Sequence, residues 1–435
     1  MRHLKKYDNE ADIQSALRNG ILGKPYVVLL SGGTLDYDTM DVGPDPLTFD
    51  ILTDGYINWE ASMSPSDAKA IRYSLNGGEW TEIISVDGDD CRIPVVAGDT
   101  LRFLGDNARY GNSEDGPANR FANSTAEFNA RGNIMSLVDS ENFDTLTTVS
   151  PNAFNGLFRN ARTLKDASGL VLPATTLAEN CYKELFSSCV SLTAVPALPA
   201  TTLADNCYSN MFRDCTSLTT APELPATTLA YYCYESMFQG CTSLTTAPEL
   251  PVTTLAGGCY WNMFYGCTSL TAAPELPATT LAEDCYVGMF EGCASLTTAP
   301  ELPATTLASN CYENMFQDCT SLTAAPVLPA TDVHGAGSCY SSMFKGCTSL
   351  TAAPDLPSAR VEPGCYANMF EGCTSLNRVK CLTTREIKSE PYAGFPYTYN
   401  WLKDASATGT FTKKAGVNWV RSYNGIPEGW TVVEE

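Results

Sequence analysis

A motif of 26 residues repeats along most of this chain and constrains its fold more than any other feature. It reads Cys-Tyr-x-x-Met-Phe-x-x-Cys-Thr-Ser-Leu, followed by Thr-x-Ala-Pro-x-Leu-Pro-Ala-Thr-Thr-Leu. A fixed period of this length is typical of a solenoid, because one unit cannot bury its own apolar side chains and needs stacked neighbours. The first cysteines of the eight units are spaced by 26 residues, except for one gap of 28 that contains His334; they are Cys181, Cys207, Cys233, Cys259, Cys285, Cys311, Cys339 and Cys365.

A degenerate ninth unit precedes these eight. Ala153 and Ala161 stand at its cysteine positions, while Phe154, Phe158 and Leu164 keep the apolar ones. The array therefore has nine units and begins well before the first cysteine of the motif.

Within a unit, the apolar residues favour a short helix followed by a strand. They recur at i, i+1, i+4, i+5 and i+8, which is the stripe of one helical face and predicts about two helical turns per unit. The next segment, 218–222 in one unit, is Leu-Thr-Thr-Ala-Pro, and it predicts one brief strand per coil that ends at the proline. The stripe in that unit consists of Cys207, Tyr208, Met211, Phe212 and Cys215.

Over residues 153–382 the repeat resembles the leucine-rich repeats of BspA-like bacterial surface proteins. The shared pattern is Met-Phe-x-x-Cys-x-x-Leu, and a phenylalanine stands at the same position in all nine units, from Phe158 to Phe370. The resemblance implies a right-handed horseshoe or rod that serves adhesion and recognition and has no catalytic role.

The part ahead of the repeat divides in two. Residues 1–43 predict a docking segment with a helix capped by Asn9 and a strand over 26–30. Residues 44–132 contain several strand-like runs and an Asn-Gly-Gly hairpin signal at 76–78, which predict a small Ig-like β-sandwich.

The solenoid is predicted over residues 133–382 and a C-terminal cap over 383–435. The predicted fold class is mainly β with short helices: a leucine-rich-repeat solenoid preceded by the sandwich. The cap is inferred because the last segment breaks the period and contains four large aromatic residues, Trp401, Phe411, Trp419 and Trp430.

Both ends of the chain carry further resemblances. Residues 5–12, running into 24–30, resemble the starts of structural proteins from phages of gut Bacteroidales, including crAss-like phages. The ending over 426–430 resembles the tails of Bacteroides-type repeat proteins. The first residues lack the roughly 7 to 15 apolar residues of a secretory signal. We therefore expect a virion protein, because a particle released by lysis can carry a surface-type array without an export signal.

Charge limits the partners. The chain has 49 acidic residues against 27 lysines and arginines, for a formal net charge of -22. Nucleic acid and anionic membranes bind positively charged surfaces, so neither is expected as a partner. No apolar run is long enough to predict membrane insertion. Two histidines, His3 and His334, are too few for most metal or triad chemistry.

The eighteen cysteines have three readings: metal ligands, disulfides or small buried residues. Zinc sites favour roughly two to four residues between paired cysteines, whereas here seven intervene, so no metal site and no cofactor is predicted. A helix rises about 12 Å over eight residues, beyond the roughly 7 Å Cα limit of a disulfide, so the two cysteines of one unit should not pair. Bridges between neighbouring coils stay open. Ala153 and Ala161 favour small volume over sulfur chemistry, hence free thiols.

Other motifs were weighed against simpler readings. Leu-Pro-Ala-Thr-Thr at 172–176 looks like a sortase signal but recurs in the middle of the chain. Two acidic clusters, 36–45 and 87–90, offer calcium ligands, but solvated turns explain them as well and neither matches the calcium-loop pattern. No phosphate-binding loop, nucleophile elbow or zinc-protease motif occurs, so the chain is not expected to be an enzyme.

The sequence thus favours a non-enzymatic phage virion protein, of fibre or decoration type, that binds a host surface glycan or protein through its solenoid. Other virion proteins would be bound by the N-terminal segment. The alternatives are a bacterial cell-surface BspA-like adhesin and a glycan-active enzyme that uses the repeats for binding. Self-association is left open, because no coiled-coil heptad indicates it.

Four aromatic residues are the candidate ligand-binding site. They are Tyr231 and Tyr232 before one first cysteine, and Trp261 and Tyr265 in the next unit, where other units have mostly small or polar residues. At 100° per helical residue, Trp261 and Tyr265 should both point outward and lie side by side, with the tyrosine pair of the preceding coil beside them. Exposed aromatic patches usually mark interaction sites, and the alternative is chance variation at tolerant surface positions or a contact between protomers.

Overall fold

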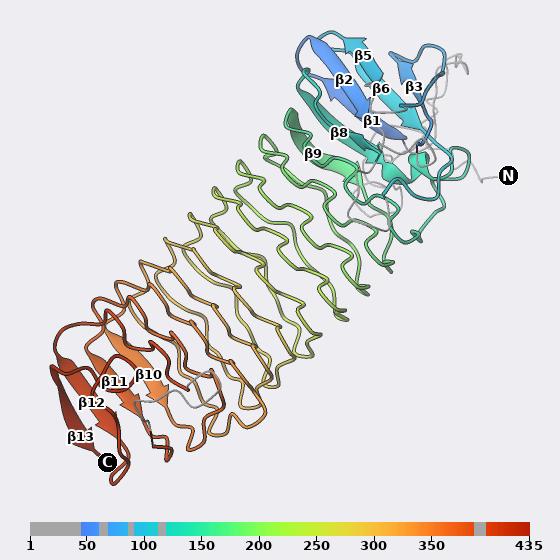
Figure 1. The fold of residues 1–435 in the computed structure, drawn as a ribbon. Helices are drawn as coiled ribbons and strands as arrows, with labels where there is room; N and C mark the ends of the chain where they lie inside the picture. Colours follow the sequence, from blue (N-terminus) through green and yellow to red (C-terminus); the bar gives the residue numbers. More distant parts are fainter. Residues whose placement is uncertain (1–44, 61–67, 86–90, 112–118, 387–396) are drawn as a thin grey trace, which may run out of the picture.

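The computed structural model describes residues 45–60, 68–85, 91–111, 119–386 and 397–435. These residues form an elongated rod with a β-sandwich at its N-terminal end and a four-stranded sheet at its C-terminal end (Figure 1). The helix predicted after Asn9 and the strand predicted over 26–30 lie outside the described residues.

Two sheets form the sandwich that was predicted ahead of the repeat. The first has six strands in the order β4-β3-β6-β1-β8-β9, and the second has three in the order β5-β2-β7. Their bounds are β1 Leu47–Ile51, β2 Gly55–Glu60, β3 Ile71–Leu75, β4 Thr81–Ile83, β5 Cys91–Val95, β6 Thr100–Leu104, β7 Arg120–Phe121, β8 Phe128–Asn133 and β9 Leu164–Val171.

Aromatic rings fill the space between the two sheets. Phe49 and Phe103 come from the first sheet, and Trp59 and Phe121 from the second; all four are fully buried. The ring of Phe121 lies 4.8 Å from those of Phe49, Trp59 and Phe103. Alternating apolar residues of the strands thus build the core, as expected for a sandwich.

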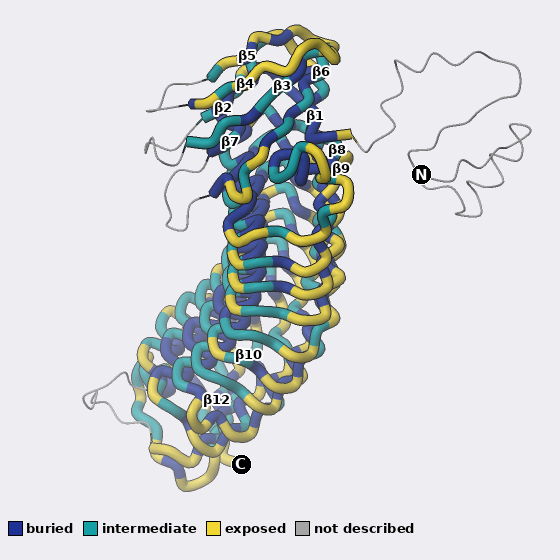
Figure 2. Tube along the Cα trace, turned by 90° about the vertical axis from the view of Figure 1, so that its right-hand side faces the viewer, coloured by how far each residue is buried: buried dark blue, intermediate teal, exposed yellow. Residues whose placement is uncertain are grey.

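The sandwich and the solenoid share one core. Strand β8 pairs in parallel with β9, which belongs to the first coil, so the boundary predicted between residues 132 and 133 lies inside a strand. Phe158 of the first coil lies 5.9 Å from Phe49 and 5.8 Å from Phe121. Buried residues accordingly continue from the sandwich into the coils (Figure 2).

Each coil contains a chain of β-turns where the sequence predicted two helical turns. In the coil that starts at Cys207, the N–H of Met211 donates to the carbonyl of Tyr208 at 3.1 Å, which closes a turn. The next N–H, that of Phe212, instead donates to the carbonyl of Met237 in the following coil, at 2.9 Å. This alternation repeats along the segment, so half of its amides hold the turns and half join neighbouring coils. Among the described residues, the one helix with its own bounds is the 3-10 helix η3, Ile134–Leu137.

Left-handed residues prevent the helix. Asn206, Asn210 and Asp214 have φ of 55°, 57° and 58°, one at every fourth position. An α-helix of L-residues excludes this conformation, whereas Gly, Asn and Asp adopt it readily in turns. The buried pairs recur every four residues, so they mimic the helical i, i+4 stripe from which the helix was predicted.

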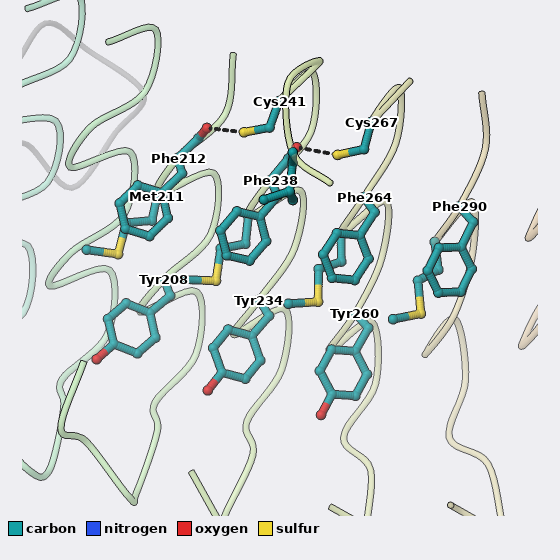
Figure 3. Packing of buried hydrophobic residues seen from close by; sticks show 14 of the residues in the cluster. Tyr208, Met211, Phe212, Tyr234, Phe238, Cys241, Tyr260, Phe264, Cys267 and Phe290 are labelled. Carbon is teal, nitrogen blue, oxygen red and sulfur yellow. Dashed lines mark hydrogen bonds between the residues drawn. The ribbon is translucent and has the colours of Figure 1, made fainter. Parts of the chain in front are cut away.

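Stacked side chains hold neighbouring coils together. The rings of Tyr208 and Tyr234 stack at 5.9 Å, and those of Phe212 and Phe238 at 5.6 Å (Figure 3). The thiol of Cys241 donates to the carbonyl of Phe212 at 3.1 Å, which adds a polar link between coils. Equivalent contacts occur along the array, so the Cys, Tyr, Met and Phe stripe predicted for each unit forms its core.

The strand expected in each coil is mostly reduced to single bridges. Thr246 makes parallel bridges to Thr220 in the preceding coil and to Ala272 in the following one. Longer strands occur at the C-terminal end, where four pair in parallel in the order β10-β11-β12-β13. They are β10 Ala352–Leu356, β11 Arg378–Cys381, β12 Gly409–Lys413 and β13 Trp430–Glu434.

Within the predicted cap, residues 397–435 continue the solenoid before closing it. The N–H of Phe370 donates to the carbonyl of Trp401 at 2.9 Å, the same relation that links earlier coils. The Trp401 ring stacks 5.5 Å from Trp419, and Phe411 lies 4.9 Å from Trp419. The large aromatic side chains of this segment therefore extend the ladder by another coil and cover its end.

Candidate binding surface on the solenoid

The four aromatic residues singled out in the sequence lie on two neighbouring coils; we call them the aromatic patch. Tyr231 is 61% exposed and Tyr265 is 38% exposed, while Tyr232 and Trp261 are half-buried. The rings of Tyr232 and Trp261 lie 5.8 Å apart at 43°. The ring contact thus joins residues of two neighbouring coils and places Tyr232 beside Trp261, which is where the tyrosine pair was expected.

Two glycines make room for the tyrosines. Tyr231 and Tyr232 lie over Gly257 and Gly258 of the next coil, each 26 residues further along the chain, and a Cβ on either glycine would collide with the tyrosine ring above it. A large residue in one coil is therefore matched by a glycine in the next. The sequence contains this pairing, but it becomes meaningful only once the coils are aligned.

The outward orientation of Trp261 and Tyr265 was predicted from helical angles, but these residues lie in a chain of β-turns. Trp261 and Tyr265 follow Cys259 by two and six residues, between the buried pairs of the turn chain. Tyr265 is exposed as expected, but Trp261 is partly covered by Tyr232. Tyr232 itself has a φ of 52°, at a position where other coils have Asn, Asp, Ser or Gly.

Carboxylates surround the patch. Burial raises the pKa of Tyr232, and the charges of Asp284, Glu235 and Glu283 raise it further. The backbone N–H of Tyr231 donates to a carboxylate oxygen of Asp205 at 3.0 Å. The aromatic rings are thus framed by negative charge from three coils.

The sequence reasoning missed the charge of the central coils. No lysine or arginine occurs between Arg213 and Lys345, and twelve acidic residues do. A run of like charge this long gives the surface a negative potential that attracts cations. The twelve are Asp214, Glu223, Glu235, Glu249, Glu275, Glu283, Asp284, Glu291, Glu301, Glu313, Asp318 and Asp332.

Successive coils also form shallow grooves along their Pro-Glu-Leu-Pro segments. One is lined by residues 221–225 with Pro248, Glu249 and Pro251, and equivalent grooves follow one and two coils later. Each groove contains two glutamates, one from each of two neighbouring coils, and each glutamate follows a proline. The repeated Pro-Glu-Leu-Pro motif was the signal for these grooves.

The two acidic clusters considered as calcium sites lie mostly outside the described residues. Of the acidic cluster 36–45, Asp45 is described and forms an ion pair with Arg131; the rest of that cluster and 87–90 lie outside the described residues. Among the described residues, no group of three or more His, Cys, Asp and Glu side chains is placed to hold a metal ion. None of the described helices is long and apolar enough to cross a membrane.

Comparison with known proteins identifies the repeat. Residues 133–262 and 260–354 match the model of the BspA type leucine rich repeat region, in six copies. No curated protein matches the chain.

Proposed function

Because the chain belongs to the BspA-type leucine-rich repeat family, we propose that it is a non-enzymatic binding protein that attaches to a cell surface through its solenoid. Repeats of this type indicate a role in surface adhesion and binding. The observation that supports this role most directly is the aromatic patch, which places four large rings on two adjacent coils with two of them largely or partly exposed.

We further propose that the chain is a phage virion protein whose N-terminal segment docks to other virion proteins. The resemblance of residues 5–12 and 24–30 to phage structural proteins supports this assignment. The alternative is a bacterial cell-surface BspA-like adhesin. Mass spectrometry of purified phage particles and of cell envelopes separates the two. Peptides of the chain in particles support the virion protein, and peptides confined to envelopes overturn it.

Binding of the fluorescently labelled full chain to cells of gut Bacteroidales tests the proposed function. We expect saturable binding that is lost in the variant Tyr232→Ser/Trp261→Ser/Tyr265→Ser. The absence of saturable binding to any strain of a broad panel would contradict a surface-binding role.

A matched control variant carries Asn180→Ser and Lys183→Ser. These residues occupy the same positions relative to Cys181 that Tyr232 and Trp261 occupy in their own coils, and Ser187 is already a serine at the position of Tyr265. The control should bind like the wild type. If both variants melt like the wild type and only the aromatic one loses binding, the patch is the contact surface.

A further inference from the structure

The aromatic patch and the charge around it have one chemistry in common, which is attraction for a cation. The face of a tyrosine or tryptophan ring carries negative electrostatic potential, and a cation over such a face is stabilised. Here the Tyr232 and Trp261 rings lie 5.8 Å apart at 43°, so they contact each other at an angle and present one joined aromatic surface, which we call the corner.

Carboxylates lie within electrostatic reach of that corner on both sides. Glu235 lies in the coil of Tyr232, one coil before Trp261, and is held by a hydrogen bond from the Ser209 hydroxyl at 3.0 Å. Asp284 follows Trp261 by one coil, and its Oδ1 accepts from the amide of Asn310 at 3.0 Å. Both carboxylates are therefore held in place by neighbours in the structure.

The nearest basic residues along the chain do not neutralise this charge. Arg213 is engaged with Asp214 at 3.5 Å, and Lys345 with Glu371 at 3.2 Å. No lysine or arginine lies between them in the sequence. A partner that docks here meets a negative surface on every side, which would repel an anionic polysaccharide and attract a basic peptide.

We propose that the aromatic patch binds an arginine- or lysine-containing segment of a partner protein, with a cationic side chain packed against the Tyr232 and Trp261 rings. This inference rests on the proposed surface-binding function and specifies its partner. The guanidinium plane stacks on an aromatic ring while its N–H groups donate to the carboxylates, so arginine suits the corner better than lysine. A neutral or anionic glycan carries no cation and so gains no cation–π attraction.

Fluorescence anisotropy on the full chain tests the proposal with two labelled peptides, (Gly-Arg)5 and its uncharged analogue (Gly-citrulline)5. We expect the arginine peptide to bind at least about tenfold more tightly, and its binding to weaken as salt rises from 0.05 to 0.5 M, because the screening length of exposed charges falls from roughly 14 Å to roughly 4 Å over that range. Equal affinity for the two peptides, or no binding of either, would overturn the proposal.

Two patch variants and one charge-matched control separate a built site from general attraction. Tyr232→Ser/Trp261→Ser removes the rings, and Glu235→Gln/Glu283→Gln/Asp284→Asn removes the surrounding charge; each should weaken the arginine peptide about fivefold or more. Glu223→Gln/Glu249→Gln/Glu301→Gln removes the same charge from the Pro-Glu-Leu-Pro segments and should change affinity less than about twofold. An equal loss in the control would mean that the whole negative surface binds the peptide, which overturns a site at the patch.

The cell-binding assay keeps the two proposals apart. If cells bind the wild type and the charge variant equally well, and excess arginine peptide does not compete, the chain is a surface-binding protein whose partner is not basic. If the arginine peptide binds at the patch while no cell of the panel is bound, the basic-segment site stands and the surface-binding function fails.

Discussion

The Sγ atoms of Cys339 and Cys365 lie 2.9 Å apart in neighbouring coils, both fully buried. The second cysteine of each unit is engaged differently: the Cys347 thiol, for example, donates to the Phe316 carbonyl at 3.1 Å. In a disulfide the sulfur atoms are about 2.05 Å apart, so Cys339 and Cys365 need to approach by less than an ångström to bond. A bridge between neighbouring coils, left open by the sequence, therefore has a specific candidate pair.

We predict that the solenoid folds with its thiols reduced and that they react slowly in the native state. Burial raises the pKa of Cys181 and of Cys233 to about 12, so few thiolates form at pH 8. Titration with a thiol reagent should count few sulfhydryls in the native chain and close to eighteen in denaturant. Mostly bridged sulfur, together with a melting temperature that falls on adding reductant, would contradict this.

Under mild oxidation with a glutathione disulfide buffer, Cys339–Cys365 should be the first pair to bridge. The reason is the short Sγ–Sγ distance, which leaves little movement to complete the bond. Peptide mapping by mass spectrometry after alkylation of the remaining thiols identifies the pair. The Cys339→Ala variant should leave Cys365 free, and a different first bridge in the wild type would refute the assignment.

Replacing Phe264 with alanine should destabilise the chain by about 3–5 kcal/mol, through lost burial and the cavity that remains. Phe264 is fully buried, and its ring stacks at 5.7 Å on both Phe238 and Phe290. Chemical denaturation measures the loss. Val327→Ala, at a side chain that is 78% exposed, should change stability by less than about 0.5 kcal/mol. A loss below about 1 kcal/mol for Phe264→Ala would show that its ring is not part of the core.

The period and the ladders could be predicted from the sequence, but the backbone of the turns could not. Buried residues that recur at i, i+1, i+4 and i+5 suit both a helix of 3.6 residues per turn and a chain of β-turns with a period of four. The chain of β-turns is distinguished from the helix by Asn, Asp, Gly or Ser at every fourth position, as at Asn206, Asn210 and Asp214. These residues favour left-handed turns, and the apolar stripe alone does not reveal them.

The alanines of the first unit do not by themselves show that any small residue suffices at the cysteine positions of the later coils. Ala161 stands where later coils have the cysteine that donates to a phenylalanine carbonyl of the preceding coil. The first coil has no preceding repeat unit, so the loss of the thiol there does not show that sulfur is dispensable in the middle of the array. What a side chain contacts depends on which coils lie on either side of it, and the first coil differs from the others in this respect.

The members of the aromatic patch could be named from the sequence, but their neighbours could not. Tyr231, Tyr232, Trp261 and Tyr265 stand out because they depart from the repeat. Their match with Gly257 and Gly258 and their acidic surroundings depend on which residues adjacent coils place side by side. That register follows from a spacing of 26 residues only after the coils are known to stack without offset.

Glu291 should make stability depend on pH near neutrality. Burial and, after it, the charge of Asp318 raise its pKa from an ordinary 4.5 to about 7, although Lys345 opposes the shift. Between these two pH values the folded chain holds a proton that the unfolded chain has lost, so the free energy of unfolding falls as pH rises from about 4.5 to about 7. Glu291→Gln should therefore raise the melting temperature at pH 8 and leave it nearly unchanged at pH 4.

Thermal melts of the wild type, Glu291→Gln and the control Glu301→Gln across this range measure the effect. Glu301 belongs to the same unit and is exposed, so its replacement removes an equal charge without the same burial. A control that gains as much at pH 8 as Glu291→Gln would assign the gain to net charge instead of to Glu291.

The packing of Tyr232 over Gly258 should appear as an energetic coupling between the two positions. Gly258→Asn places a side chain where the Tyr232 ring lies, although asparagine itself tolerates the φ of +60° there and Asn206 and Asn310 occupy the same position in other coils. We expect the single change to destabilise the chain by about 1–3 kcal/mol through overpacking and to weaken binding at the patch. Tyr232→Asn should be nearly neutral, because it relieves the left-handed tyrosine, and the double variant should recover most of the stability.

Denaturation of the wild type, the two single variants and the double variant gives the coupling energy. Gly266→Asn is the control, since the surroundings of Gly266 within 4 Å are only backbone atoms of Gly240. Additive effects at residues 232 and 258 would mean that the ring does not rest on this glycine, and an equal coupling at residue 266 would assign the loss to asparagine itself.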